Sequence, residues 1–143
     1  MYKEIYEYNK ILNGVVEKFC IRPLSKEDIE QIALARFAQE EENGNGATKE
    51  YLEEYKKGLI RLFNEGRLLG AGAFKGDKLV SLAFFNLISY GKEKKTPYLC
   101  GVWTNPKYRG IRLATQVNKK LMQGVTETRD ELQRSSLLTI EGN

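Results

Sequence analysis

Two arginines, Arg109 and Arg112, lie in a short basic turn between a strand-like segment and a helical pattern. Asn105-Pro106 ends the strand, because proline lacks a backbone N–H and pushes the preceding residue away from the α region. The first N–H groups of a helix have no partner within it and lie at the positive end of its dipole. The turn is therefore predicted to bind an anion such as a phosphate. The helix itself is predicted by apolar side chains that recur every fourth residue: Leu113, Val117, Leu121 and Val125.

The sequence contains no histidine. This excludes histidine-dependent catalytic triads, histidine metal sites and histidine general bases. Carboxylates, tyrosine, cysteine, lysine and backbone groups are left for chemistry. Cys20 and Cys100 lie in strand-like segments outside any CxxC pair, so we expect reduced core thiols, with a single disulfide as the alternative. We expect no metal site.

The N-terminal ten residues are charged and lack the apolar core of a secretory signal. No apolar run reaches the roughly 18 residues needed to span a bilayer. We therefore expect a cytoplasmic protein that does not contact membranes.

The formal net charge of +4 is unevenly distributed. Residues 1–66 carry a net charge of −3, whereas residues 67–143, which contain the basic turn, carry +7. A basic half suits an anionic cofactor, and an acidic half suits a cationic acceptor such as an amine. Scattered solvated lysines would explain much of the same imbalance.

Hydrophobic periodicity and turn residues predict the other elements. In chain order they are a short helix within residues 1–14 (Ile5, Tyr8, Leu12), a strand over 15–24, a helix capped by Ser25 that fades at 40–42, a helix from Thr48 to Gly66, strands over 68–74 and 79–88 joined by a hairpin, a polar loop over 91–97, the strand–turn–helix, and a last strand over 136–140. This order predicts a mixed α/β fold in a single domain spanning residues 1–143.

The segment 102–114 resembles the acyl-CoA signature of the GNAT superfamily of N-acyltransferases. That signature is a strand, an x-Pro-x-Tyr-Arg-Gly turn and Arg/Gln-x-x-Gly-x-Gly/Ala at the start of a helix. Arg109 and Ala114 match its ends, whereas Arg112 stands where the family has its middle glycine. The element order over residues 15–143 is also similar to that of the family through its fifth strand. The resemblance implies a GNAT-like mixed central sheet flanked by helices.

The resemblance implies acetyl-CoA or a related acyl-CoA as cosubstrate and an N-acetyltransferase reaction. An amine of a small molecule or peptide would attack the thioester directly. The pyrophosphate would lie on the turn and the first helical N–H groups, and the pantetheine arm on the backbone of the preceding strand. The residues implied in cofactor binding are Val102, Trp103, Thr104, Arg109, Gly110, Ile111, Arg112, Leu113, Ala114, Thr115 and Asn143.

The acceptor pocket of the family is built from its first two helices and the loop between them. By resemblance this implies Phe37, Glu40, Glu41, Glu42, residues 43–46 and Tyr51. A solvated acidic helix end and a mobile surface loop would show the same sequence.

In the family, a further helix with a general-acid tyrosine and two last strands follow the fifth strand. The sequence stops at Asn143, so we expect a C-terminally short domain. We then expect either that another copy of the chain covers the edge of its last strand in a homo-oligomer, or that the protein is marginal in solution. Residues 97–104 contain no carboxylate. Glu141 is the nearest candidate base by analogy with the family, and a water that relays the proton to a backbone group or to Tyr98 is the alternative. No catalytic residue is assigned.

Two other functions fit part of the pattern. A non-catalytic acyl-CoA-binding or regulatory module would explain the lack of an assigned acid and base. A nucleic-acid-binding domain would use the basic second half, but its aromatic residues match no RNA-recognition signature, so we expect no nucleic-acid partner.

Overall fold

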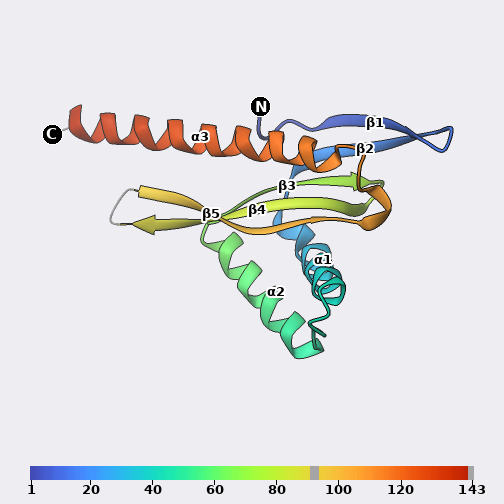
Figure 1. Cartoon of the computed structure of the whole chain (residues 1–143). Coiled ribbons are helices and arrows are strands. Elements are labelled where there is room, and N and C mark those ends of the chain that lie inside the picture. The colour runs from blue at the N-terminus through green and yellow to red at the C-terminus, as the bar shows by residue number, and fades with distance from the viewer. Residues whose placement is uncertain (91–93, 142–143) are drawn as a thin grey trace.

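The computed structural model describes residues 1–90 and 94–141, with side chains described for residues 1–87 and 98–131. Its centre is a five-stranded antiparallel sheet whose strand order equals the chain order (Figure 1). The strands are β1 (Tyr6–Leu12), β2 (Val15–Pro23), β3 (Leu68–Lys75), β4 (Lys78–Tyr90) and β5 (Lys94–Thr104). The helices are α1 (Ile29–Glu42), α2 (Lys49–Asn64) and α3 (Leu113–Glu141), with 3-10 turns at Lys26–Asp28 and Pro106–Tyr108. The predicted α/β class is confirmed.

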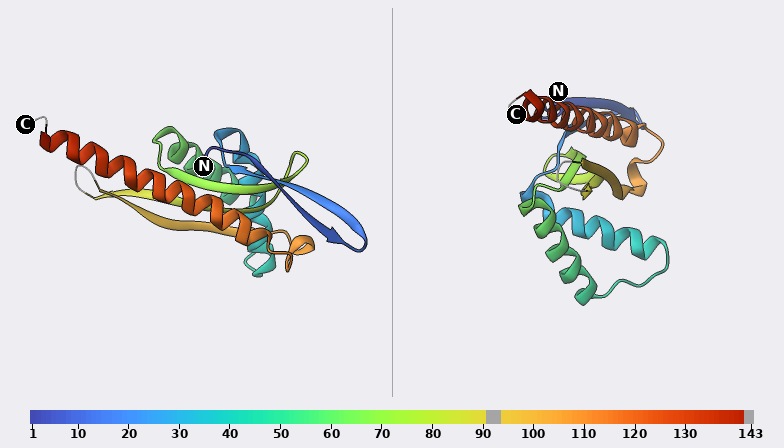
Figure 2. Two further views of the ribbon diagram at one scale, coloured as in Figure 1. Left: turned by 90° about the horizontal axis from the view of Figure 1, so that it is seen from above. Right: turned by 90° about the vertical axis from the view of Figure 1, so that its left-hand side faces the viewer.

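The helices cover opposite faces of the sheet, α3 one face and α1 with α2 the other (Figures 1 and 2). Each face has its own apolar core, because side chains alternate along strands that are buried on both sides. The core under α3 is centred on Phe19, Ile21, Val80, Val117 and Leu121. The core against α1 and α2 is centred on Leu24, Ile32, Leu59, Leu82 and Phe84.

The predicted helix within residues 1–14 is wrong, because Tyr6–Leu12 forms the edge strand β1. It pairs with β2 in a hairpin that runs from the pair Tyr6–Ile21 to the pair Leu12–Val15. Asn13 and Gly14 both have positive φ, at 51° and 79°. A two-residue loop of this kind matches the twist of the flanking strands and fixes the hairpin.

The predicted strand over residues 136–140 is also wrong, since these residues continue α3. The sequence after Gly124 contains no glycine or proline before Gly142 that would stop the helix. A short apolar run fits a strand and a helix equally well. The end of α3 extends past the β4–β5 hairpin (Figures 1 and 2). In the described part of the chain β5 is therefore the edge strand opposite β1, and the predicted edge at 136–140 does not exist.

The predicted loop over residues 91–97 is shorter than expected, because β5 already begins at Lys94. Residues 91–93 lie outside the described residues. The predicted hairpin between β3 and β4 is confirmed, with Gly76 in the left-handed region (φ 59°). The predicted cap of α2 is confirmed too, since the Thr48 hydroxyl accepts a hydrogen bond from the Tyr51 N–H (3.1 Å).

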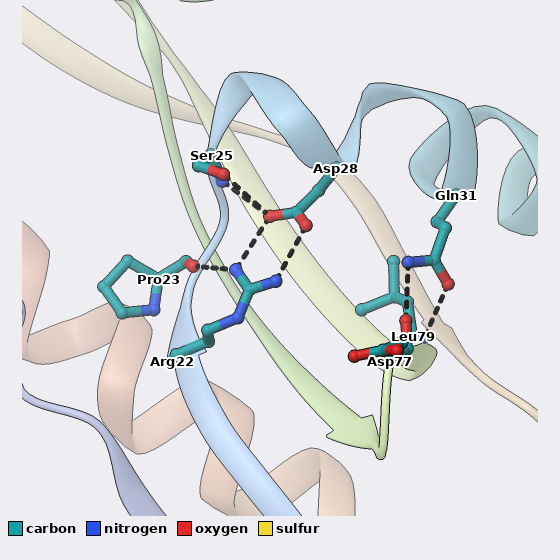
Figure 3. A network of polar contacts seen from close by, with 7 residues as sticks. All are labelled: Arg22, Pro23, Ser25, Asp28, Gln31, Asp77 and Leu79. Atoms are coloured by element: carbon teal, nitrogen blue, oxygen red, sulfur yellow. Dashed lines mark hydrogen bonds and ion pairs between the residues drawn. The ribbon is translucent and has the colours of Figure 1, made fainter.

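The junction between β2 and α1 is held by a network of buried polar contacts (Figure 3). The Arg22 guanidinium donates to both carboxylate oxygens of Asp28, at 2.9 and 2.8 Å. Asp28 also accepts from the Ser25 N–H (2.7 Å). One turn later, the Gln31 side chain donates to the Asp77 carbonyl and accepts from the Leu79 N–H. The start of α1 is thereby fixed to the sheet on two sides.

Candidate functional site

The turn between β5 and α3 begins with a closed, well-bonded segment. The Asn105 side-chain oxygen accepts a hydrogen bond from the Lys107 backbone N–H (3.0 Å). The backbone N–H of Asn105 donates to the Val80 carbonyl (2.8 Å). Pro106 starts a 3-10 turn in which the Tyr108 ring is buried against Phe19 of the β1–β2 hairpin. The chain therefore leaves the sheet at a fixed angle.

The next part of the turn uses unusual backbone conformations. Gly110 has φ 84° and Arg112 has φ 64°. Only glycine adopts positive φ at no steric cost, so the arginine stores strain of about 1–2 kcal/mol. Strain of this kind concentrates at functional sites. The position where the sequence lacks the family's middle glycine thus keeps the backbone conformation that a glycine favours.

The N–H groups of this turn are available to a ligand. Among the described residues, those of Gly110, Ile111 and Arg112 find no acceptor within the protein. The orphan N–H groups at the start of α3 follow directly, with Leu113 buried beneath them. Consecutive N–H groups next to a helix N-terminus form an anion-binding surface.

The two arginines of the turn have different surroundings. Arg109 turns toward α1, where its guanidinium donates to the Glu42 carboxylate (2.7 Å) and to the Thr104 carbonyl (2.8 Å). Arg112 is exposed and makes no ion pair with any side chain that the structure describes. Of the two arginines, Arg112 is therefore the one without an ion pair among the described residues, and Arg109 joins the turn to the end of α1.

Glu42 is the residue that brings these elements together. Its carboxylate also accepts from the Trp103 indole N–H (3.1 Å). The hydrogen bonds from Arg109 and then Trp103 lower the pKa of the Glu42 carboxyl below its usual value. Glu42 is thus an anion at neutral pH, and it fixes the last residues of β5 against α1.

Strand β5 contains a β-bulge. Phe84 on β4 pairs with Gly101, but its neighbour Phe85 pairs with Leu99, so Cys100 is an additional residue. A side chain at Gly101 would collide with the Phe84 ring, so glycine is required for this approach. A bulge leaves backbone groups outside the ladder and turns them away from it. The bulged residue Cys100 lies two positions before the predicted segment Val102, Trp103 and Thr104.

The predicted strand residues are placed as follows. Val102 is exposed, and its carbonyl accepts from the Gln39 side chain of α1 (3.0 Å). The Thr104 hydroxyl lies 2.8 Å from the Ser81 hydroxyl of β4. Tyr98 and Leu99, beside the bulge, are also exposed, at 62% and 52%. The edge of β5 is thus an accessible strip that is partly apolar.

Three of the residues predicted for the acceptor pocket, Glu40, Glu42 and Tyr51, form polar contacts with neighbouring side chains. Glu40 pairs with Arg36 (3.0 Å) and accepts from Asn45 (2.9 Å). Arg36 also donates to the Tyr51 hydroxyl (3.1 Å), and the rings of Tyr51 and Tyr55 stack 6.2 Å apart. Burial raises the pKa of Tyr55 to about 12, so its hydroxyl stays protonated. The geometry brings these residues to one end of the α1–α2 pair.

Three further expectations concern single residues. Glu141 is the last described residue of α3 and does not end a strand as predicted. Asn143 lies outside the described residues. Cys20 and Cys100 are free, half-buried thiols.

The described residues hold no group of histidine, cysteine or acidic side chains that could bind a metal ion. None of the helices in the described part of the chain is long and apolar enough to cross a membrane.

Two contacts of the site are not foreseeable from the local sequence. The Glu42–Arg109 pair joins residues 67 positions apart. The Tyr8 hydroxyl donates to the Ile111 carbonyl (2.9 Å). Tyr8 lies in β1, where the spacing of apolar residues wrongly predicted a helix. The alternation of Tyr6, Tyr8 and Leu12 before Asn13-Gly14 is the signal that could have found it.

No protein-family model matches the sequence, and no curated protein matches it. Solved structures do match. A protein from Clostridium acetobutylicum, described as a predicted acetyltransferase and crystallised with acetyl-CoA, has a TM-score of 0.68 at 18% identity, over 78% of this chain and 75% of that chain. A GCN5-related N-acetyltransferase from Ralstonia eutropha has a TM-score of 0.63 at 17% identity, over 77% of each chain.

An aminoglycoside acetyltransferase from an uncultured soil metagenomic sample, crystallised with sisomicin, has a TM-score of 0.59 at 17% identity, over 77% of this chain and 71% of that chain. At these identities the likeness concerns the fold. The chain has the fold of the GNAT acetyltransferases, which confirms the fold that its strand–turn–helix signature predicted.

Proposed function

We propose, from the fold shared with GNAT acetyltransferases, that residues 1–143 form one N-acyltransferase domain that transfers an acetyl group from acetyl-CoA to a primary amine. The observation that carries the proposal is the row of unpaired N–H groups at Gly110, Ile111 and Arg112, followed by the N-terminus of α3. A diphosphate is the kind of ligand that such a surface binds. The neighbour crystallised with acetyl-CoA supports the same cosubstrate.

In this proposal the pyrophosphate contacts the turn and the first turn of α3, formed by Gly110, Ile111, Arg112, Leu113, Ala114 and Thr115. Arg112 supplies the nearby positive charge, because its side chain is exposed and unengaged among the described residues. Arg109 supports the turn through Glu42. The pantetheine arm follows the edge of β5 along Val102, Trp103 and Thr104. Asn143 remains a predicted contact.

The reaction forms a C–N bond and breaks the C–S bond of the thioester. A base removes a proton from the attacking ammonium, and an acid protonates the leaving thiolate. Backbone N–H groups of the bulge around Cys100 are the candidates to stabilise the oxyanion that develops in between. We assign neither the base nor the acid to a side chain.

The acceptor is proposed to be a cationic amine of a small molecule or peptide. Glu40, Glu41 and Glu42 lie at the end of α1. Arg36 pairs with Glu40 and Arg109 with Glu42, whereas Glu41 is exposed and has no ion-pair partner among the described residues, so it favours a cation on this side of β5. An aminoglycoside acetyltransferase among the neighbours supports a polyamine-like acceptor.

The two free thiols agree with a reducing, cytoplasmic location.

A thermal melt with and without excess acetyl-CoA tests cosubstrate binding, with adenosine as the control ligand. A ligand at about 100 times its dissociation constant stabilises the folded state by roughly 2.7 kcal/mol, or on the order of 5–10 °C for a domain of this size. Arg112→Ala should reduce the shift, whereas Arg129→Ala, which removes an exposed arginine further along α3, should not. A cooperative melt without any shift would remove the basis of the proposal.

A non-catalytic acyl-CoA-binding module is the second candidate. One observation favours it, namely that β5 carries no carboxylate beside the bulge. Release of free CoA in the presence of a panel of amines separates the two functions. Turnover supports the enzyme, and tight binding without turnover supports the module.

A further inference from the structure

The β1–β2 hairpin contacts the segment from the β5–α3 turn to the first turn of α3 at three places. Phe19 of β2 packs edge-to-face on the Tyr108 ring, with centroids 5.4 Å apart. The Tyr8 hydroxyl of β1 donates to the Ile111 carbonyl (2.9 Å). The Tyr6 hydroxyl donates to the Gln116 carbonyl (3.2 Å) in the first turn of α3. The hairpin thus contacts residues before, within and after the row of unpaired N–H groups at 110–112.

The bond from Tyr8 has a geometric consequence for the N–H of Arg112. The Ile111 carbonyl and the Arg112 N–H belong to one planar trans peptide, in which the two groups point in opposite directions. Because Tyr8 draws the carbonyl toward β1, the N–H is directed away from β1. This is one of the N–H groups that find no acceptor among the described residues.

The same bond lies beside the strained residue of the turn. Arg112 follows this peptide immediately and has φ 64°. A side chain in the left-handed region persists only where its surroundings hold it. Leu113 is buried on one side of Arg112, and the Tyr8 bond fixes the peptide on the other side. Tyr8 and Ile111 are both partly buried against the core under α3, so the bond is partly shielded from water.

We propose that Tyr8 is a positioning residue that holds the Ile111–Arg112 peptide in its ligand-binding orientation. Tyr8 lies outside residues 15–143, over which the sequence resembles the family. The ligand side of this inference rests on the proposed binding of acetyl-CoA. The hairpin is then a part of the cosubstrate site that makes no contact with the cosubstrate itself.

The test compares Tyr8→Phe with Tyr2→Phe. The Tyr2 hydroxyl donates to the Gly70 carbonyl (2.6 Å), so Tyr2→Phe also removes a half-buried tyrosine hydrogen bond. Tyr2 contacts α3 near Gly124, well beyond the turn. The first readout is limited trypsin cleavage after Arg109 and Arg112 without any ligand. Tyr8→Phe should accelerate cleavage there about fivefold, as expected for one lost hydrogen bond, and Tyr2→Phe should not.

The second readout is the dissociation constant for acetyl-CoA by calorimetry. Tyr8→Phe should weaken binding by about five- to tenfold, and Tyr2→Phe should leave it unchanged. In an Arg112→Gly background the effect of Tyr8→Phe should shrink to less than about twofold, because glycine adopts the positive φ unaided.

Unchanged trypsin cleavage in Tyr8→Phe, or equal acceleration in Tyr2→Phe, would overturn the positioning role. If the unmodified protein does not bind acetyl-CoA, the proposed function fails, and the trypsin comparison alone decides whether Tyr8 holds the turn. Faster cleavage with an unchanged dissociation constant would overturn the link between the hairpin and the ligand.

Discussion

The molecule contains two junctions at which a strand leads through a 3-10 turn into a helix. At the junction of β2 and α1, polar groups are paired with one another, and Asp28 is 3% exposed. At the junction of β5 and α3, a row of N–H groups has no acceptor among the described residues, and Arg112 is held in a left-handed conformation. The two junctions share a local shape and differ in whether their polar groups are satisfied.

This difference distinguishes a junction whose polar groups stabilise the fold from the junction that we propose to bind a ligand. Buried polar groups that bond one another contribute to stability and leave nothing for a ligand. Exposed N–H groups in a strained turn contribute little to stability and keep their bonding capacity for a partner. The first junction should therefore respond to mutation in its stability, and the second in its ligand affinity.

Asp28→Asn should have the largest effect. It removes the charge that Arg22 pairs with in a largely buried site, which should lower the free energy of unfolding by about 2–3 kcal/mol. Urea denaturation measures the loss, and Glu27→Gln, one residue earlier and exposed, is the matched control with little expected change. The melting shift caused by acetyl-CoA should persist in the folded variant. Loss of that shift would contradict the separation of the two junctions.

The same junction should fail in acid. Burial alone would raise the pKa of the Asp28 carboxyl, but the hydrogen bonds from Arg22 and Ser25 outweigh it and leave the pKa lowered. The ion pair therefore stabilises the folded protein above the pKa of Asp28 in the unfolded chain, about 3.9. This contribution is lost as the pH falls through the lower pKa of Asp28 in the folded protein. Urea denaturation between pH 6 and about pH 2.5 should show this loss, and the profile of Asp28→Asn should be flatter. Parallel profiles would contradict the assignment.

Gly110→Ala should cost about 1–2 kcal/mol of stability through backbone strain alone, since φ is 84° and an added Cβ would meet no atom within 4 Å. Gly58→Ala is the matched control. It lies in α2 with equally open space, so alanine should stabilise the protein by about 0.5–1 kcal/mol. Calorimetric melting of both variants measures the difference. The same sign at both positions would show that the turn is not constrained as described.

Arg112→Gly should have the smallest effect on stability, a gain of about 0.5 kcal/mol, because relief of the left-handed strain exceeds the entropy cost of glycine. Arg129→Gly, the same substitution in the middle of α3, should instead destabilise by about 1 kcal/mol. Acetyl-CoA should bind the Arg112→Gly variant more weakly and with less dependence on salt, since a cation is lost. Unfolding and titration at two salt concentrations check both statements.

Much of the fold could be predicted from patterns of residues that are close together in the sequence. Proline, capping residues and four-residue spacing placed the turn at Pro106, the cap at Thr48 and the start of α3 correctly. Two elements failed because a short apolar pattern is ambiguous. Ile5, Tyr8 and Leu12 fit a helix by spacing, but Tyr6–Leu12 forms a strand, since pairing with β2 decides the outcome. Residues 136–140 fit a strand but continue a helix that nothing interrupts.

The candidate site could be predicted only in its local part. The anion turn and the odd position of Arg112 follow from adjacent residues, and the structure gives Arg112 the conformation that a glycine favours. The engagement of Arg109 with Glu42 and of Val102 with Gln39 could not be predicted, because each pair joins distant segments. The bulge at Cys100 depends on the register with β4, which residue types alone do not determine.

The contact between Glu42 and Arg109 joins the two ends of the candidate site. It connects the turn, on the proposed cosubstrate side, with the end of α1, on the proposed acceptor side. A phosphate that draws the guanidinium away releases the carboxylate for an ammonium, and an ammonium that takes the carboxylate releases the guanidinium. Linkage then requires that each ligand changes the affinity of the other by the same factor. If the proposed function holds, this one ion pair would couple the binding of the two substrates.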